Sequence, residues 1–99
     1  MISIKIHSSY RLIVALADSS LIGKKFSEDI REIDVNPNFF KGDEKKEDEI
    51  IDILKEMEKE DATFNIVGEK SIKAAITAGI ITEEGIFTID NIPIALKLL

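Results

Sequence analysis

The run FNIVGEKSIKAAITAGII, from Phe64 to Ile81, restricts the possible folds more than any other part of the sequence. Its first residues have the aromatic and β-branched character of a short strand, and Gly68 then permits a turn. Apolar side chains at helical spacing follow, and Gly79 is a suitable stop for that helix. A second short strand, GIFTID, comes next, and units of strand, helix and strand almost always have parallel strands and a right-handed crossover. The second half of the chain is therefore predicted to contain a parallel β-α-β unit.

Two strands are predicted at the N-terminus, and they differ in how far each is covered. In ISIKIH the residues Ile2, Ile4 and Ile6 alternate with polar ones, which is typical of an edge or outer strand with one face in water. In LIVALA, residues 12–17, both faces are apolar, so this strand is expected at the centre of a covered sheet. The connection SSYR has the length of a hairpin loop. The two strands are therefore predicted to be antiparallel neighbours.

The segment between these two halves is predicted to hold a helical turn, a strand, a loop and a long helix. Asp18 or Ser19 can cap the helical turn, which Gly23 then ends. REIDV alternates like a strand, and NPNFFKGD carries the proline and glycine of a loop. From Asp43 to about Glu60, apolar residues at helical spacing predict an amphipathic helix that lies on the sheet.

The length and composition fit one globular domain, residues 1–99. A chain of 99 residues hides roughly 65% of the surface that its unfolded form exposes, which is enough for a core without metal or disulfides. The tail IPIALKLL is apolar at every second position and is predicted to be a strand, although Pro93 after Asn91 also allows a short helix. The predicted fold class is α+β: a single-domain mixed β-sheet with an N-terminal antiparallel hairpin and a later parallel β-α-β unit, covered mostly on one face by two main helices.

The charge and composition disfavour several partners and exclude some chemistry. A formal net charge of −6 repels nucleic acid and anionic membranes, although a local basic patch would still attract them. No apolar run approaches the roughly 20 residues that span a bilayer, so we expect no membrane segment and a cytoplasmic location. The absence of cysteine excludes disulfides and thiolate chemistry. Heavy use of isoleucine, lysine and glutamate, without glutamine or tryptophan, favours a thermophilic source.

The turn from Asn65 to Ser71 is the best candidate for a binding site. A strand that leads through glycine into a helix leaves backbone N–H groups free at the helix start, and these groups favour an anion. The string GEKS is similar to the end of a phosphate loop, but Glu69 and Phe64 stand where that loop needs glycine. The charge of Glu69 also opposes a bound phosphate. The favoured interpretation is a turn shaped by Gly68, with an anion site as the alternative.

No catalytic set, metal site or cofactor motif is predicted elsewhere. His7 is the only histidine and is expected on an exposed hairpin turn. One imidazole without thiolates leaves only carboxylates for a metal, and the sequence does not show that these converge. Several lysines near the aromatic pair of residues 39 and 40 could form a small basic patch for nucleic acid: Lys24, Lys25, Lys41, Lys45 and Lys46. No cofactor is therefore expected, and an enzymatic role is disfavoured.

Four segments carry a family resemblance across nearly the whole chain. They are DSSLIGKKF, FFKG, FNIVGEKSIKAAITAGII and NIPIAL, and NIVGE followed by AGII is the most specific part. In their order and spacing they resemble the small archaeal family catalogued as domain of unknown function four hundred and twenty-four, which has no established activity. The resemblance implies a compact, cytoplasmic archaeal protein of one domain. Many members have a histidine directly after the matching proline, where this chain has Ile94, and this difference weakens a chemical role there.

The resemblance also marks individual positions. The matching residues are Gly23, Lys24, Gly42, Asn65, Gly68, Glu69, Gly79 and Pro93, and turn geometry explains the glycines as well as function does. Together with the candidate turn, they give the predicted ligand-binding or partner-binding residues: Lys24, Asn65, Gly68, Glu69, Lys70, Ser71 and Pro93.

The predicted function is a non-catalytic binding or interaction module, with a protein partner or self-association favoured. One alternative is a protein or enzyme that holds a small phosphate-bearing ligand at the turn of residues 65–71. A further alternative is an RNA-associated or translation-associated factor, which the net charge disfavours.

Overall fold

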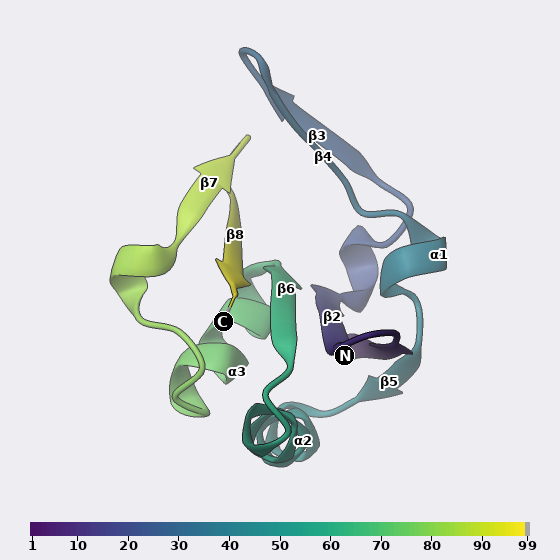
Figure 1. Cartoon of the computed structure of the whole chain (residues 1–99). Coiled ribbons are helices and arrows are strands. Elements are labelled where there is room, and N and C mark those ends of the chain that lie inside the picture. The colour runs from purple at the N-terminus through teal and green to yellow at the C-terminus, as the bar shows by residue number, and fades with distance from the viewer. Residues whose placement is uncertain (99) are drawn as a thin grey trace.

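The chain folds around a six-stranded mixed sheet (Figure 1). The structure is a computed structural model, and it describes residues 1–98. The strand order is β5-β1-β2-β6-β8-β7, with bounds β1 Ile2–Ser8, β2 Leu12–Asp18, β5 Asp43–Lys45, β6 Thr63–Val67, β7 Phe87–Ile89 and β8 Ile92–Lys97. A separate two-stranded sheet contains β3 Lys25–Glu28 and β4 Arg31–Asp34. The helices are α1 Pro37–Phe40, α2 Glu47–Lys59 and α3 Glu69–Thr77, with 3-10 turns at Ser19–Leu21 and Glu83–Gly85. The predicted α+β fold of a single domain with a mixed sheet and two main helices is confirmed.

β1 and β2 form the predicted antiparallel hairpin, in which Ile2 lies opposite Asp18. β2 is the third of the six strands and Val14–Ala17 are completely buried, so its central position is confirmed. The prediction that β1 is an edge or outer strand was wrong for its first half, because β5 pairs with residues 2–4. In the described part of the chain, no strand pairs with the outer side of residues 5–8, and that half keeps the character of an edge.

Two parallel connections run through the sheet. β2 and β6 are adjacent and parallel, and the connection between them contains α2. The predicted unit of β6, α3 and β7 is also present: β8 is antiparallel to both strands, so β6 and β7 run in the same direction. β8 lies between them because a two-residue turn, Asp90 and Asn91, folds it back on β7. Both turn residues have positive φ, 50° and 65°, as a type I′ hairpin turn requires.

α2 and α3 pack on one face of the sheet and enclose the larger core. Ile50 and Leu54 of α2 and Ala75 of α3 are fully buried there, as the helical spacing predicts. The predicted stop of α3 is confirmed, because Gly79 takes a φ of 78° just beyond the helix. The tail is a strand, β8, as the alternating pattern predicts.

Two local predictions between residues 36 and 47 were wrong. α2 begins at Glu47 rather than Asp43, because residues 43–45 form β5 and pair with β1. The predicted loop NPNFFKGD contains the one-turn helix α1. Its start is capped by Asn36, whose side-chain oxygen accepts a hydrogen bond from the Asn38 N–H at 2.8 Å.

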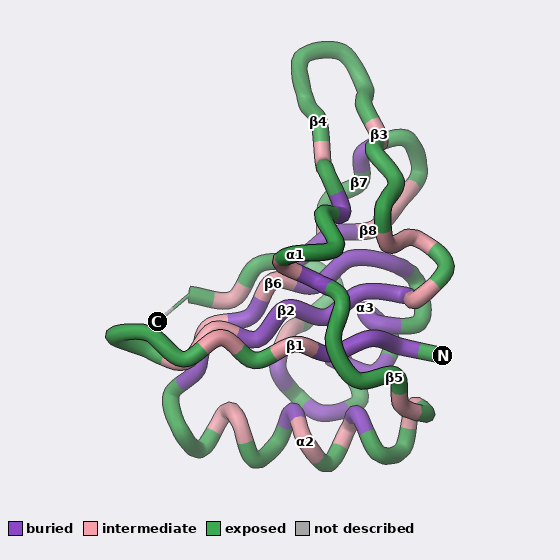
Figure 2. Tube along the Cα trace, turned by 90° about the vertical axis from the view of Figure 1, so that its right-hand side faces the viewer, coloured by how far each residue is buried: buried purple, intermediate pink, exposed green. Residues whose placement is uncertain are grey.

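The other face of the sheet carries a smaller, second core. Val35 and Phe40 are buried there and pack with Ala17 and Val67 of the central strands. REIDV supplies β4 as predicted, but this strand pairs with β3 and not with the main sheet. In Figure 2 the β3–β4 hairpin projects from the body of the molecule, and Ile30 at its tip is fully exposed. No helix within residues 1–98 is long and apolar enough to cross a membrane.

Candidate functional site

The turn between β6 and α3 is held by a carboxylate from the neighbouring strand. Asp18, the last residue of β2, accepts hydrogen bonds from the N–H groups of Lys70 and Ser71 at 3.1 and 2.8 Å. The Ser71 hydroxyl donates a third hydrogen bond to the same carboxylate, at 2.8 Å. Asp18 is only 8% exposed, and Ser71 is fully buried. The sequence predicted that the N–H groups at the start of α3 are free to bind a ligand. The Asp18 carboxylate occupies those of Lys70 and Ser71 instead.

Gly68 is required at this turn for two reasons. Its φ is 108°, in a region that residues with a side chain rarely adopt. A Cβ at this position would lie 2.4 Å from Asp18 Cγ, so the carboxylate could not approach the helix. The Gly68 N–H also donates to the Pro93 carbonyl oxygen at 2.9 Å, which ties the turn to β8. Four of the predicted residues thus meet at one junction: Gly68, Lys70, Ser71 and Pro93.

Four of the predicted residues line a small pocket of about 200 Å³ at this junction. Its lining residues are Asp18, Leu21, Gly68, Glu69, Lys70, Ile92 and Pro93. Asn65 does not line it, because it lies within the sheet, opposite Ala15 on one side and Leu96 on the other. Lys24 follows the first 3-10 turn and is exposed there. A ligand-binding role for the seven residues stays a prediction.

Asp18 is the residue of this junction that the sequence did not place there. The sequence suggested Asp18 as a local cap for the next helical turn, but that 3-10 turn has no side-chain cap hydrogen bond. Ala17 lies opposite Val67 in the parallel pair, so Asp18 and Gly68 leave the sheet side by side. An acidic residue after one buried strand and a glycine after another can indicate such a junction. The indication requires that the two strands are known to be parallel neighbours.

A second pocket, of about 410 Å³, shares Lys70 with the first one. It is lined by Met1, Ile2, Lys46, Glu47, Lys70 and Lys73. Its three lysines come from the residue before α2 and from α3. Of the lysines that the sequence grouped into a basic patch, Lys46 is the one that lines this pocket.

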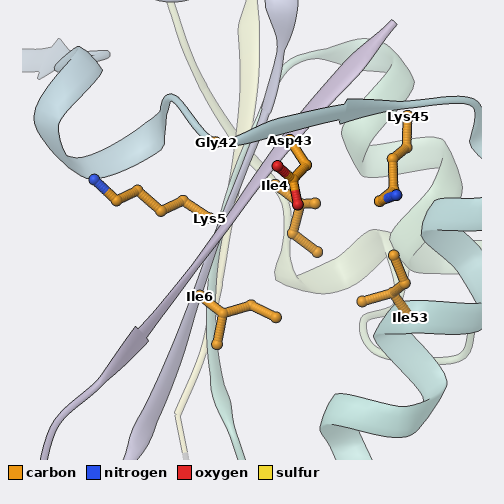
Figure 3. Close-up of a pocket in the computed structure, with 7 residues that line it drawn as sticks. All are labelled: Ile4, Lys5, Ile6, Gly42, Asp43, Lys45 and Ile53. Atoms are coloured by element: carbon orange, nitrogen blue, oxygen red, sulfur yellow. The ribbon is translucent and has the colours of Figure 1, made fainter.

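A third pocket, of about 320 Å³, lies beside the open half of β1 (Figure 3). It is lined by Ile4, Lys5, Ile6, Gly42, Asp43, Lys45 and Ile53. The Lys5 side chain points away from the pocket toward α1, where its Nζ donates to the Asn38 carbonyl oxygen at 2.8 Å. The isoleucines of β1 and α2 lie on the other side of the β1 backbone and give the pocket its apolar surface.

Comparison with known proteins places the chain in a family. The model of a family described as protein of unknown function, DUF424, matches residues 6–97. The chain belongs to the DUF424 family. The crystal structure of an uncharacterized conserved protein from Methanopyrus kandleri is similar, with a TM-score of 0.87 and 21% sequence identity over 96% of this chain and 88% of that chain. That likeness shows the fold alone, and the sequence matches no curated protein.

His7 contributes to packing in this DUF424 protein. It lies within β1 and not on the hairpin turn that the sequence predicted for it. Its ring stacks on Phe39 at a centroid distance of 4.7 Å, and its Nε2 lies 2.8 Å from the Phe39 carbonyl oxygen. Among residues 1–98, no three acidic, histidine or cysteine side chains gather in a way that could hold a metal ion.

Proposed function

We propose that this DUF424 protein is a non-catalytic interaction module that binds an extended segment of a partner protein as an added strand. The observation that carries the proposal is the open edge of β1 at residues 5–8, beside the pocket of Figure 3. A sheet edge with unpaired N–H and C=O groups is a place where another chain can add a strand. The amino-acid composition favours a thermophilic source and the family resemblance implies an archaeal one, and a cytoplasmic location stays a prediction.

The backbone of Ile6 and Ser8 faces the open edge. Along an antiparallel strand, successive residues direct their backbone groups alternately toward one neighbour and the other. The Ser19 N–H donates to the Met1 carbonyl oxygen at 3.1 Å, in the register of the β1–β2 pair. Odd-numbered residues of β1 therefore bond to β2, and even-numbered residues point away from it. Ile6 and Ser8 each offer an N–H and a C=O to an added strand.

Isoleucine side chains provide a surface for an apolar side chain of the added strand. Ile6 is 42% exposed, whereas Ile4, on the same face of β1, is 5% exposed. Ile53 of α2 lines the other wall of the pocket. Proteins usually protect an open edge with charges, especially lysine, or with a covering segment. The charge of Lys5 is directed toward α1, so Ile6 is the side chain of the open half that faces the pocket. The partner segment is therefore expected to carry an apolar residue opposite Ile6.

A short peptide fits this edge better than a second copy of the chain does. Four strand residues span about 13 Å. A stable symmetric dimer buries roughly 800 Å² on each partner, far more than a contact of that length supplies. Asp43 and Lys45 line the same pocket, so a basic or an acidic residue of the peptide can pair with one of them.

Selection of heptapeptides from a random library against the full chain tests this proposal. The affinity of the selected peptides is then measured by fluorescence polarisation for the wild type, for Ile6→Lys and for Ile30→Lys. Ile30 is the matched control, because it is a fully exposed isoleucine at the tip of the β3–β4 hairpin. We expect Ile6→Lys to weaken binding roughly tenfold or more, because about 1.4 kcal/mol of apolar contact is lost, and Ile30→Lys to leave binding unchanged.

The position of the bound peptide is a second measurement in the same experiment. The amide protons of Ile6 and Ser8 should gain protection from exchange when the peptide binds, because they become bonded to it. Unchanged protection, no selected peptide, or equal affinities for both variants would each contradict the proposal. If the protein forms a dimer that the Ile6→Lys change dissociates, the strand that adds to this edge belongs to a second copy of the chain and not to a peptide.

A further inference from the structure

Three lysine side chains surround the pocket beside the starts of α2 and α3. Lys46 directly precedes α2, and Lys70 and Lys73 lie three residues apart on one side of α3. Glu47 is the one carboxylate among the residues that line the pocket. The whole chain has 19 acidic and 13 basic residues, so this local excess of positive charge is opposite to the overall balance.

The three ammonium groups have no carboxylate within salt-bridge distance in residues 1–98. The ion pairs in that part of the chain join Lys59 to Glu56 and Lys97 to Glu58. Like charges that face one cavity repel each other, and an anion placed between them would remove that repulsion. The cluster therefore has the charge of an anion-binding site.

The size and walls of the pocket narrow the class of anion. Its volume of about 410 Å³ lies in the range of sites for small molecules, which is roughly 300–1,000 Å³. Met1, which is 53% exposed, adds an apolar wall to the charged one, and the buried Ile2 lies beneath it. A ligand with an anionic group and a flat or apolar body matches both walls, whereas an inorganic ion alone would leave the apolar wall unused.

We propose that this pocket binds a phosphate-bearing small molecule of about nucleotide size. Its phosphate oxygens lie against Lys46, Lys70 and Lys73, and its body lies chiefly against Met1. Lysine is suited to this role because its compact charge and three donors meet phosphate oxygens without a fixed geometry. The phosphate is held by side chains, because the N–H groups at the start of α3 are already bonded to Asp18.

This proposal goes beyond the proposed strand addition and does not depend on it. The lysine pocket and the pocket at the open edge of β1 have no lining residue in common. Failure of one proposal therefore leaves the other standing.

Isothermal titration of the full chain with ADP, sodium pyrophosphate and citrate tests the inference. Pyrophosphate supplies the phosphate groups without the body, and citrate supplies a carboxylate anion of similar charge. The test variant is Lys70→Gln/Lys73→Gln. The control is Lys55→Gln/Lys59→Gln, which removes the same charge from exposed lysines of α2.

We expect ADP to bind most tightly, pyrophosphate more weakly and citrate weakest. The test variant should lose roughly tenfold or more in affinity for ADP, and the control less than about twofold. A hundredfold excess of ADP over its Kd should raise the Tm of the wild type by on the order of 10 °C.

Four results would overturn the proposal. They are the absence of binding heat with both ADP and pyrophosphate, an equal loss of affinity in the control variant, citrate binding as tight as that of ADP, and tighter binding of an RNA decamer than of ADP. The last result would assign the lysines to nucleic acid, and its affinity would fall steeply with salt.

Discussion

At the scale of single residues, Asp18 takes the place that a bound anion would have at the start of α3. Its carboxylate accepts hydrogen bonds from residues that are 52 and 53 positions away along the chain. A buried donor that loses its partner is costly, because water does not replace the lost hydrogen bond. A ligand at this helix start would have to displace Asp18, and this is why we assign phosphate binding to the lysine side chains beside it.

Replacing Asp18 by alanine should destabilise the protein by about 2–3 kcal/mol, the combined cost of a lost cap and of buried donors left without a partner. The measurement is urea unfolding followed by circular dichroism. Asp52→Ala, an exposed aspartate of α2, is the control and should change the free energy of unfolding by less than about 0.5 kcal/mol. A similar loss in both variants would show that the junction does not depend on Asp18.

At the scale of elements, patterns that follow from burial were predictable and features that depend on a distant partner were not. β2 was predictable because a strand that is buried on both faces is apolar at every position. α2 and α3 were predictable because helices that are buried on one face carry apolar residues at helical spacing. β5 consists of the charged triplet DEK, and nothing in that triplet selects a strand. β8 enters the sheet beside β6 through the turn of Asp90 and Asn91, and the alternating pattern of the tail does not indicate which strands it pairs with.

The candidate site was predictable in part for the same reason. Gly68, Lys70 and Ser71 lie in one continuous stretch, and their place at a helix start is visible from that stretch alone. Asp18 and Lys46 come from other elements. Their positions follow from the parallel pairing of β2 with β6 and from the packing of α2 beside α3, which no local pattern records.

One buried hydroxyl helps to hold the segment that contains α1 against β1, beside the contacts that Lys5 and His7 make with residues 38 and 39. Ser3 Oγ donates to the Phe40 carbonyl oxygen at 3.0 Å and accepts from the Gly42 N–H at 2.9 Å. Gly42 passes so close to β1 that a Cβ would lie 2.1 Å from the Ile4 carbonyl oxygen. These contacts decide where the chain leaves α1 and where β5 begins.

Ser3→Ala should therefore cost about 1–3 kcal/mol of stability, because a half-buried N–H and a buried C=O lose their partner. Hydrogen exchange should become faster at the Gly42 amide and along residues 43–45, while the amides of α3 keep their protection. Ser27→Ala, in the exposed strand β3, is the matched control. Unchanged exchange at Gly42 would mean that packing of Phe40 alone holds the segment.

At the scale of the whole molecule, the sheet is covered on both faces, by a larger layer on one face and a smaller layer on the other. Two long helices enclose one core, and α1 with the base of the β3–β4 hairpin encloses the other. The radius of gyration over Cα atoms is 12.3 Å, close to the roughly 13 Å expected for a folded domain of this length. The chain therefore has the compactness of an ordinary folded domain.

We expect the protein to be a monomer at micromolar concentration, because the open half of β1 and the three-residue edge strand β7 are each too short for a stable symmetric dimer. Small-angle X-ray scattering should give a radius of gyration near 13 Å. Analytical ultracentrifugation should give the mass of one chain. The Ile6→Lys variant should give the same values. A concentration-dependent mass that this variant abolishes would reveal association through the β1 edge.

The β3–β4 hairpin makes the molecule tolerant of added sequence at one defined place. Asp29, with a φ of 57°, and the fully exposed Ile30 form a tip that projects away from both cores in Figure 2. Exposed tips of this kind accept insertions with little loss of stability, since the added residues do not disturb packing. An affinity tag or a fluorescent label inserted there would leave the β1 edge and the lysine pocket accessible, with both chain termini unmodified.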